Sequence, residues 1–131
     1  MWIEAALLLL ILAIVYRFMW KSGPKRKVPV NKARLYFFYT TWCGHSKKAM
    51  PEWEKVKTAL ANSAVFGSTT VEPVEVDAEK EPALASLYEV NGYPTIQLET
   101  SSGVYDFNRM VTSDNVLNFV RDTLGKEPKS L

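Results

Sequence analysis

The residues best suited to chemistry form one motif, Trp42-Cys43-Gly44-His45-Ser46, which follows an apolar run and precedes a helical pattern. Cys43 is the only cysteine, so no disulfide can form within one chain. A cysteine at a helix start meets free backbone N–H groups and the positive end of the helix dipole, and both favour the thiolate. We therefore predict that Cys43 is a reactive nucleophile, with His45 adding positive charge when it is protonated.

Hydrophobic periodicity places this motif between a strand and a helix. Residues 35–40 (LYFFYT) form a nearly continuous apolar run, which is typical of a central strand covered on both faces. Ser46 fits the N-cap of the helix that follows, and Pro51 is expected to kink that helix. The apolar residues of this helix recur at spacings of four, three and four, which predicts one buried stripe: Ala49, Trp53, Val56 and Leu60.

Beyond residue 60 the pattern predicts a strand, a short helix, a hairpin of two strands and a last helix: residues 71–77, 81–90, 95–100, 104–107 and 113–124. The short helix is expected to bury Leu84, Leu87 and Tyr88. The last helix begins at Ser113 and is expected to end at Gly125. The order β-α-β-α-β-β-α predicts an α/β fold with a mixed sheet of four strands.

Composition and charge exclude several classes of protein. A length of 131 residues fits one domain of ordinary size. Residues 1–34 carry seven Lys/Arg against one acid, whereas residues 35–131 carry nine against thirteen, so the main domain is acidic. Such a domain lacks the clustered basic residues that bind a phosphate backbone, and we expect no nucleic-acid partner. One cysteine also excludes a multi-cysteine zinc or iron–sulfur site within the chain, and no metal site is expected.

Residues 1–20 are predicted to form a transmembrane anchor helix. The stretch from Trp2 to Trp20 is apolar except for Glu4 and Arg17 near its ends, and about 20 helical residues span the hydrocarbon core of a bilayer. The two tryptophans suit the membrane interfaces. A cleaved signal peptide fits less well because the amino end is not basic, and a soluble core helix fits less well because the stretch has no polar face.

A basic, flexible linker is predicted at 21–33, a folded domain at 34–125 and a polar tail at 126–131. The basic residues follow the apolar stretch, so the positive-inside rule places the domain of this single-pass protein in the cytosol. They would contact anionic lipid headgroups or serve only to set the orientation. A domain in the ER lumen, or a protein of a virion membrane, stays open as an alternative.

The motifs together resemble those of the thioredoxin and protein disulfide isomerase superfamily. WCGHS matches the WCGHC redox motif of that superfamily in four of five positions. Lys47 and Pro51 match the basic residue and the helix kink that follow it, and Tyr93-Pro94-Thr95 matches its cis-proline loop. The resemblance covers residues 33–125 and implies a thioredoxin fold that acts on protein thiols or disulfides without a cofactor.

The expected substrate site surrounds the cysteine. The resemblance implies that Pro94 is cis and lies beside Cys43, and that Tyr93 offers backbone hydrogen bonds to an extended substrate. Trp42 is expected to shield the thiol and to contact the substrate, and Gly44 to let the backbone approach closely.

Three features depart from the superfamily's pattern. Ser46 replaces the resolving cysteine, so the site has one thiol. Phe37 replaces the usual buried acid that moves protons. Only the linker precedes the first strand, so the amino-terminal strand and helix of the superfamily are expected to be missing and the fold to be a minimal version.

Two functions follow from these observations. In the first, the chain is a membrane-anchored monothiol oxidoreductase or isomerase, in which the Cys43 thiolate forms a mixed disulfide that glutathione or a partner thiol resolves. His45 or water would move the proton, and the Ser46 hydroxyl would donate a hydrogen bond to the thiolate. In the second, the chain is a catalytically weak module that captures partner proteins as a chaperone or tether.

A third interpretation rests on the likeness of CGHS to the CGFS motif of monothiol glutaredoxins, which bridge an iron–sulfur cluster between two chains with glutathione. The surrounding WCGHSKKAMP sequence is typical of the thioredoxin side, and the late Gly-Gly pair of glutaredoxins is absent. The sequence leaves the substrate and the oligomeric state open.

Overall fold

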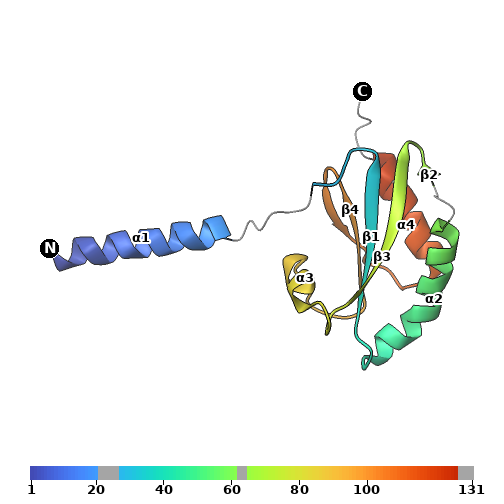
Figure 1. The fold of residues 1–131 in the computed structure, drawn as a ribbon, viewed down its shortest axis with the longest axis horizontal. Helices are drawn as coiled ribbons and strands as arrows, with labels where there is room; N and C mark the ends of the chain where they lie inside the picture. The colour runs from blue at the N-terminus through green and yellow to red at the C-terminus, as the bar shows by residue number, and fades with distance from the viewer. Residues whose placement is uncertain (21–26, 62–64, 127–131) are drawn as a thin grey trace.

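The computed structural model describes residues 1–20, 27–61 and 65–126 (Figure 1). Helix α1 (Trp2–Trp20) comes first, and its side chains at positions 2–18 are all exposed. Within the described ranges, no helix combines the length and the apolar character that a membrane crossing requires. The helix predicted at residues 1–20 is present, but its prediction as a transmembrane anchor is not supported. The uncharged stretch between Glu4 and Arg17 is residues 5–16, shorter than the about 20 residues that span a bilayer.

A mixed sheet forms the centre of the domain, with its strands in the order β2-β3-β1-β4-β5. The central strand β1 runs parallel to β3 and antiparallel to β4, and β4 and β5 form a hairpin. The five strands are β1 (Lys32–Tyr39), β2 (Val65–Phe66), β3 (Thr69–Asp77), β4 (Thr95–Thr100) and β5 (Gly103–Asp106).

The four predicted strands are all present, and β2 is an additional edge strand of two residues. The sequence pattern predicted no strand between residue 60 and residue 71. Gly67 adopts a φ of +67°, a left-handed conformation that suits glycine, and this lets the chain fold Phe66 back against Thr69 of β3.

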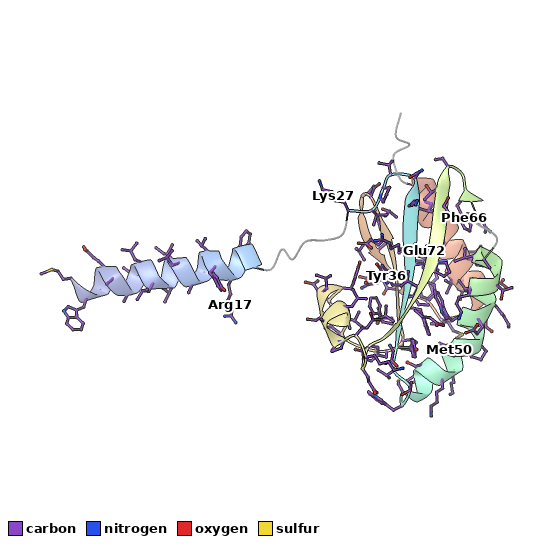
Figure 2. The ribbon with its side chains drawn as sticks, viewed as in Figure 1. Arg17, Lys27, Tyr36, Met50, Phe66 and Glu72 are labelled. Carbon is purple, nitrogen blue, oxygen red and sulfur yellow. The ribbon has the colours of Figure 1, made fainter. Side chains whose placement is uncertain are left out.

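Helices cover both faces of the sheet, with α2 and α4 on one side and α3 on the other (Figure 1). Alternate residues of β1 serve the two layers: Leu35 and Phe37 pack with α2 and α4, whereas Tyr36 and Phe38 pack under α3. All four are at most 3% exposed, which confirms the prediction of a central strand. Figure 2 shows Tyr36 on the α3 side of the sheet. The helices are α2 (Gly44–Leu60), α3 (Pro82–Leu87) and α4 (Ser113–Lys126).

The buried stripe predicted for α2 is confirmed in full. In α3 the prediction fails at Leu87, which is 42% exposed, while Ala85 takes the buried position. The helix ends at Leu87 and Glu89 adopts a positive φ of 55°, so the chain turns away before a second helical turn can bury that side chain. The predicted end of the last helix at Gly125 is also one residue short, since α4 continues to Lys126.

The domain begins before the predicted boundary at residue 34. Strand β1 starts at Lys32, and Val28, predicted to lie in the flexible linker, is only 7% exposed. The Asn31 carbonyl accepts a hydrogen bond of 2.9 Å from the Thr70 N–H, which ties this segment to β3. The remainder of the predicted linker, 21–26, and nearly all of the predicted tail, 127–131, lie outside the described residues.

Candidate functional site

The candidate site forms where β1 ends and β4 begins. These two strands are antiparallel, and Phe38, next to the end of β1, is paired with Thr95, the first residue of β4. The motif that follows β1 therefore lies beside the loop that precedes β4. The Tyr93-Pro94 peptide bond in that loop is cis, as the resemblance implied. The Cys43 Sγ lies 3.8 Å from the Tyr93 carbonyl oxygen, so Cys43 and the loop form one site.

Cys43 is the N-cap residue of α2, with φ −77° and ψ 121°. The backbone N–H of Ser46 makes the largest contribution in lowering the pKa of the thiol below its ordinary value. Burial opposes this effect, and the His45 N–H and the hydroxyls of Ser46 and Thr40 add to it. These N–H groups are the unpaired donors of a helix start, and they stabilise a thiolate more than a thiol. Cys43 is thus a partly exposed cysteine whose surroundings favour the thiolate, and its role as a nucleophile stays a prediction.

Ser46 is the third residue of α2, because the helix begins two residues earlier, at Gly44. Its side chain is 1% exposed, and its Oγ accepts a hydrogen bond of 3.3 Å from the Thr40 N–H. The N-cap role predicted for Ser46 is therefore wrong, because Cys43 holds that position. Ser46 links the first turn of α2 to the residue that follows β1.

The other predicted residues of the motif lie at its surface. Trp42 is 67% exposed and His45 is exposed, so both are accessible to a bound polypeptide. Gly44 has no heavy atom within 4 Å of the place a Cβ would occupy, so the backbone at the first residue of α2 faces open space. The predicted roles of these three residues in substrate binding and proton transfer stay predictions.

Phe37 lies in the apolar layer under the site and makes a stacked contact with Trp53, with ring centroids 4.9 Å apart and ring planes 13° apart. Both side chains are 0% exposed. The position where the superfamily usually holds an acid is therefore filled by an aromatic ring that packs against α2.

Two further features of this region were not predicted. Thr40 is 3% exposed and contributes to lowering the pKa of Cys43; its place two residues before Trp42, at the end of the apolar run, was the signal that pointed to it. A groove of about 480 Å³ borders Tyr93 and Pro94 and extends to Asp106 at the end of β5. Within residues 1–20, 27–61 and 65–126, no group of three His, Cys, Asp or Glu side chains is placed to hold a metal ion.

Comparison with known proteins gives consistent matches. The family model described as thioredoxin matches residues 25–122. Human protein disulfide-isomerase A4 is 32% identical over 104 residues, which cover 78% of this chain and 16% of that protein. Protein disulfide-isomerase 1 of Dictyostelium discoideum is 33% identical over 93 residues, which cover 70% of this chain and 25% of that protein. The chain thus spans at most about a quarter of these two relatives.

A solved structure shows the same fold. The solution structure of the first thioredoxin domain of mouse protein disulfide-isomerase A4 superposes with a TM-score of 0.61 at 29% sequence identity. The match covers 76% of this chain and 66% of that one. The α/β fold and the position of the redox motif before α2 therefore agree with the sequence resemblance.

Proposed function

Because this chain belongs to the thioredoxin family, we propose that it is a thiol–disulfide oxidoreductase that works with one thiol, that of Cys43. The observation that carries the proposal is the place of Cys43 at the N-cap of α2, where the N–H groups of Ser46 and His45 lower the pKa of its thiol. Its relatives named protein disulfide-isomerase support the same class of reaction.

In the proposed reaction, the Cys43 thiolate attacks one sulfur of a substrate disulfide. A Cys43–substrate disulfide forms, and the other substrate sulfur leaves as a thiolate. A second thiol, from glutathione or a partner protein, then attacks one sulfur of the mixed disulfide. Attack at the substrate sulfur releases the Cys43 thiolate and leaves the substrate bonded to the second thiol. Attack at the Cys43 sulfur releases the substrate as a thiolate and leaves Cys43 bonded to the second thiol, and one more thiol of the same kind then frees Cys43. A hydroxyl cannot perform this step, so Ser46 cannot release the substrate.

The surrounding groups support the thiolate in distinct ways. The Ser46 hydroxyl contributes to lowering the pKa of Cys43 while its oxygen accepts the Thr40 N–H. The exposed His45 is proposed to pass a proton to the leaving thiolate, because an imidazole can both donate and accept a proton. Tyr93 is proposed to bind the substrate backbone beside Cys43, since its carbonyl already lies 3.8 Å from the sulfur.

The test is the rate at which iodoacetamide alkylates Cys43 in the full chain as a function of pH. We expect the alkylation rate to reach half its maximum at a pH below about 8.5, the ordinary pKa of a cysteine, because only the thiolate reacts. The same chain in guanidinium chloride serves as the unactivated control. A folded protein that titrates at or above the value of the unfolded control would contradict the proposal.

A second candidate, capture of partner proteins without turnover, is favoured by the buried contact between Phe37 and Trp53. No carboxyl group can occupy the position of Phe37 to move a proton while the mixed disulfide is resolved. If the chain only captures partner proteins, Cys43→Ala would leave partner binding intact. If Cys43→Ala abolishes binding, and glutathione releases the partner from the wild-type protein, the catalytic proposal stands.

We also propose that α1 attaches the domain to a lipid bilayer, with the domain on the cytosolic side. Large apolar side chains are exposed around the whole helix, among them Leu8, Ile11 and Leu12, and the sequence KSGPKRK follows it. Apolar side chains enter the acyl region and lysines contact anionic headgroups.

Flotation of the full chain with vesicles that contain anionic lipid tests this attachment. The wild-type chain is expected to float with the vesicles. The double change Leu8→Lys and Leu12→Lys is expected to prevent flotation. A wild-type chain that stays at the bottom of the gradient would contradict the proposed attachment. Protease access to the domain in intact cells tests the cytosolic orientation.

A further inference from the structure

The groove of about 480 Å³ next to Pro94 is lined by two segments, residues 89–97 and 106–108. It is continuous with the thiol site, because Tyr93 both lines the groove and places its carbonyl 3.8 Å from the Cys43 Sγ. A polypeptide whose sulfur reaches Cys43 therefore lies beside the Tyr93-Pro94 loop, which also borders this groove.

The charged groups that line the groove have one sign. Glu89 and Asp106 carry carboxylates, and no lysine or arginine is among the lining residues. Both acids are exposed, so a ligand can reach them. Residues 35–131 as a whole carry thirteen acids against nine Lys/Arg, so the surrounding domain does not neutralise them. A groove of this kind favours a cation over an anion.

A buried amide, Gln97, holds one of these carboxylates in place. Gln97 on β4 lies opposite Asp106 on β5 and is only 5% exposed. Its Nε2 donates to the Asp106 Oδ1 at 3.0 Å and to the Tyr88 carbonyl at 3.1 Å. The Gln97 Oε1 has no hydrogen-bond partner in the described part of the chain. A buried acceptor without a donor is unusual in a folded protein, and it indicates a site that an N–H donor would complete.

We propose that this groove binds a lysine or arginine side chain of the polypeptide whose sulfur reacts with Cys43. The inference rests on the proposed function and adds a substrate class to it: basic sequences around the reacting cysteine. The ammonium or guanidinium group pairs with Asp106 and Glu89, and Gln97 takes only one of the two Asp106 carboxylate oxygens, Oδ1. Extended backbone advances about 3.3 Å per residue, so the basic residue lies on one side of the cysteine, a few positions away.

The test uses a series of blocked peptides, each with one cysteine activated as a 2-pyridyl disulfide and one lysine placed at a different distance from it. Attack by the Cys43 thiolate joins the peptide to Cys43 and releases 2-thiopyridone, whose absorbance gives the rate. Matched peptides carry glutamine in place of the lysine. We expect lysine on one side of the cysteine to raise the rate about twofold to fivefold, and high salt to remove the gain.

Variants of the full chain identify the groove as the source of the gain. Asp106→Asn keeps an oxygen that accepts the Gln97 amide, and is expected to abolish the preference for lysine over glutamine peptides. Glu89→Gln is expected to reduce the preference, and Asp122→Asn, on the exposed surface of α4, to leave it unchanged. Circular dichroism shows whether each variant is folded. If Asp106→Asn does not fold, the rates of Glu89→Gln with the lysine and glutamine peptides test the groove instead.

The outcomes separate the two proposals. Equal rates for lysine and glutamine peptides in the wild type, or a preference that survives both groove substitutions, would overturn the inference and leave the proposed function intact. Failure of every peptide to react with Cys43 would overturn the proposed function itself.

Discussion

The hydroxyl oxygen of Ser46 accepts a hydrogen bond of 3.3 Å from the backbone N–H of Thr40, and so fastens the first turn of α2 to the residue that follows β1. Cys43 lies between these two residues in the chain. The bond therefore closes the loop that carries the nucleophile, and the same two hydroxyl side chains contribute to lowering the pKa of Cys43. Ser46 thus has a structural and an electrostatic role in the position where a second thiol would resolve a mixed disulfide.

Replacing Ser46 by alanine tests this double role. In Ser46→Ala the buried Thr40 N–H loses its acceptor, which costs about 1–3 kcal/mol of unfolding free energy. The pKa of Cys43 is expected to rise toward its ordinary value, because the hydroxyl no longer stabilises the thiolate, although the N–H groups still do. Urea unfolding and the pH dependence of alkylation give the two quantities. An unchanged pKa of the Cys43 thiol in Ser46→Ala would contradict the electrostatic role of the Ser46 hydroxyl.

Glu52 gives a prediction for the pH dependence of stability. Its Oε2 accepts the Ser113 N–H at the start of α4 at 2.7 Å, and its Oε1 lies 3.0 Å from the Lys55 Nζ. The Ser113 N–H, followed by Lys55, lowers the pKa of this carboxyl below the ordinary 4.5. Because the pKa is lower in the folded state, the ionised carboxylate stabilises the fold above about pH 4.5, and this contribution is lost as the pH falls through the lowered value.

The variant Glu52→Gln lacks this titration. We expect it to be less stable than the wild type at neutral pH, and the difference to shrink as the pH falls below 4.5. Denaturant unfolding between pH 7 and pH 3 measures the difference, and Glu79→Gln, on an exposed turn, is the control. A gap between wild type and Glu52→Gln that is as large at pH 3 as at pH 7 would contradict the assignment.

Much of the fold was predictable because the burial pattern is periodic along the chain. The stripe of α2 and the two-sided burial of β1 follow directly from the spacing of apolar residues. Strand β2 was missed because two residues are too few for any period to show. Leu87 was placed wrongly because the turn at Glu89, with its positive φ, depends on how Tyr88 packs under the sheet and not on local spacing.

Some features of the candidate site could also be predicted from the sequence, and others could not. The motif at 42–46 and the loop at 93–95 were found because each has a recognisable local sequence. The pair of Gln97 and Asp106 was not found, because the two residues are nine positions apart and meet only across the β4–β5 hairpin. The one available signal was their register: a turn at residues 101–102 places them opposite each other.

Tyr88 is expected to contribute strongly to the stability of the fold through its hydrogen bond to the buried carboxylate of Glu99. Its hydroxyl donates to Glu99 Oε2 at 2.9 Å, and the Tyr36 hydroxyl lies 3.0 Å from it. Glu99 is 3% exposed, and the positively charged Arg34 lies 3.8 Å from its Oε2. Burial, with the neighbouring Tyr36 and Glu99, raises the pKa of Tyr88, so the hydroxyl stays protonated and can donate.

Removing that hydroxyl in Tyr88→Phe leaves the buried carboxylate without its shortest donor, and we expect a loss of about 2–3 kcal/mol. Tyr36→Phe removes a hydroxyl from the same cluster but keeps the contact to Glu99, so its cost is expected to be about 1 kcal/mol. Urea unfolding of both variants measures the two losses. Equal losses would show that the carboxylate is held by other groups.

Restoring a second thiol is the most direct test of a one-thiol reaction. Ser46 lies under Cys43, and its hydroxyl acts on the Cys43 sulfur, so a thiol in the same place is within reach of that sulfur. In Ser46→Cys the new thiolate attacks the mixed disulfide at Cys43, forms an intramolecular disulfide and releases the substrate as a thiol. The wild type is expected to accumulate the mixed disulfide until glutathione is added, whereas Ser46→Cys releases its substrate without glutathione. Mass spectrometry of samples quenched with acid follows both species, and substrate release by the wild type in the absence of any added thiol would show that Cys43 does not depend on an external partner.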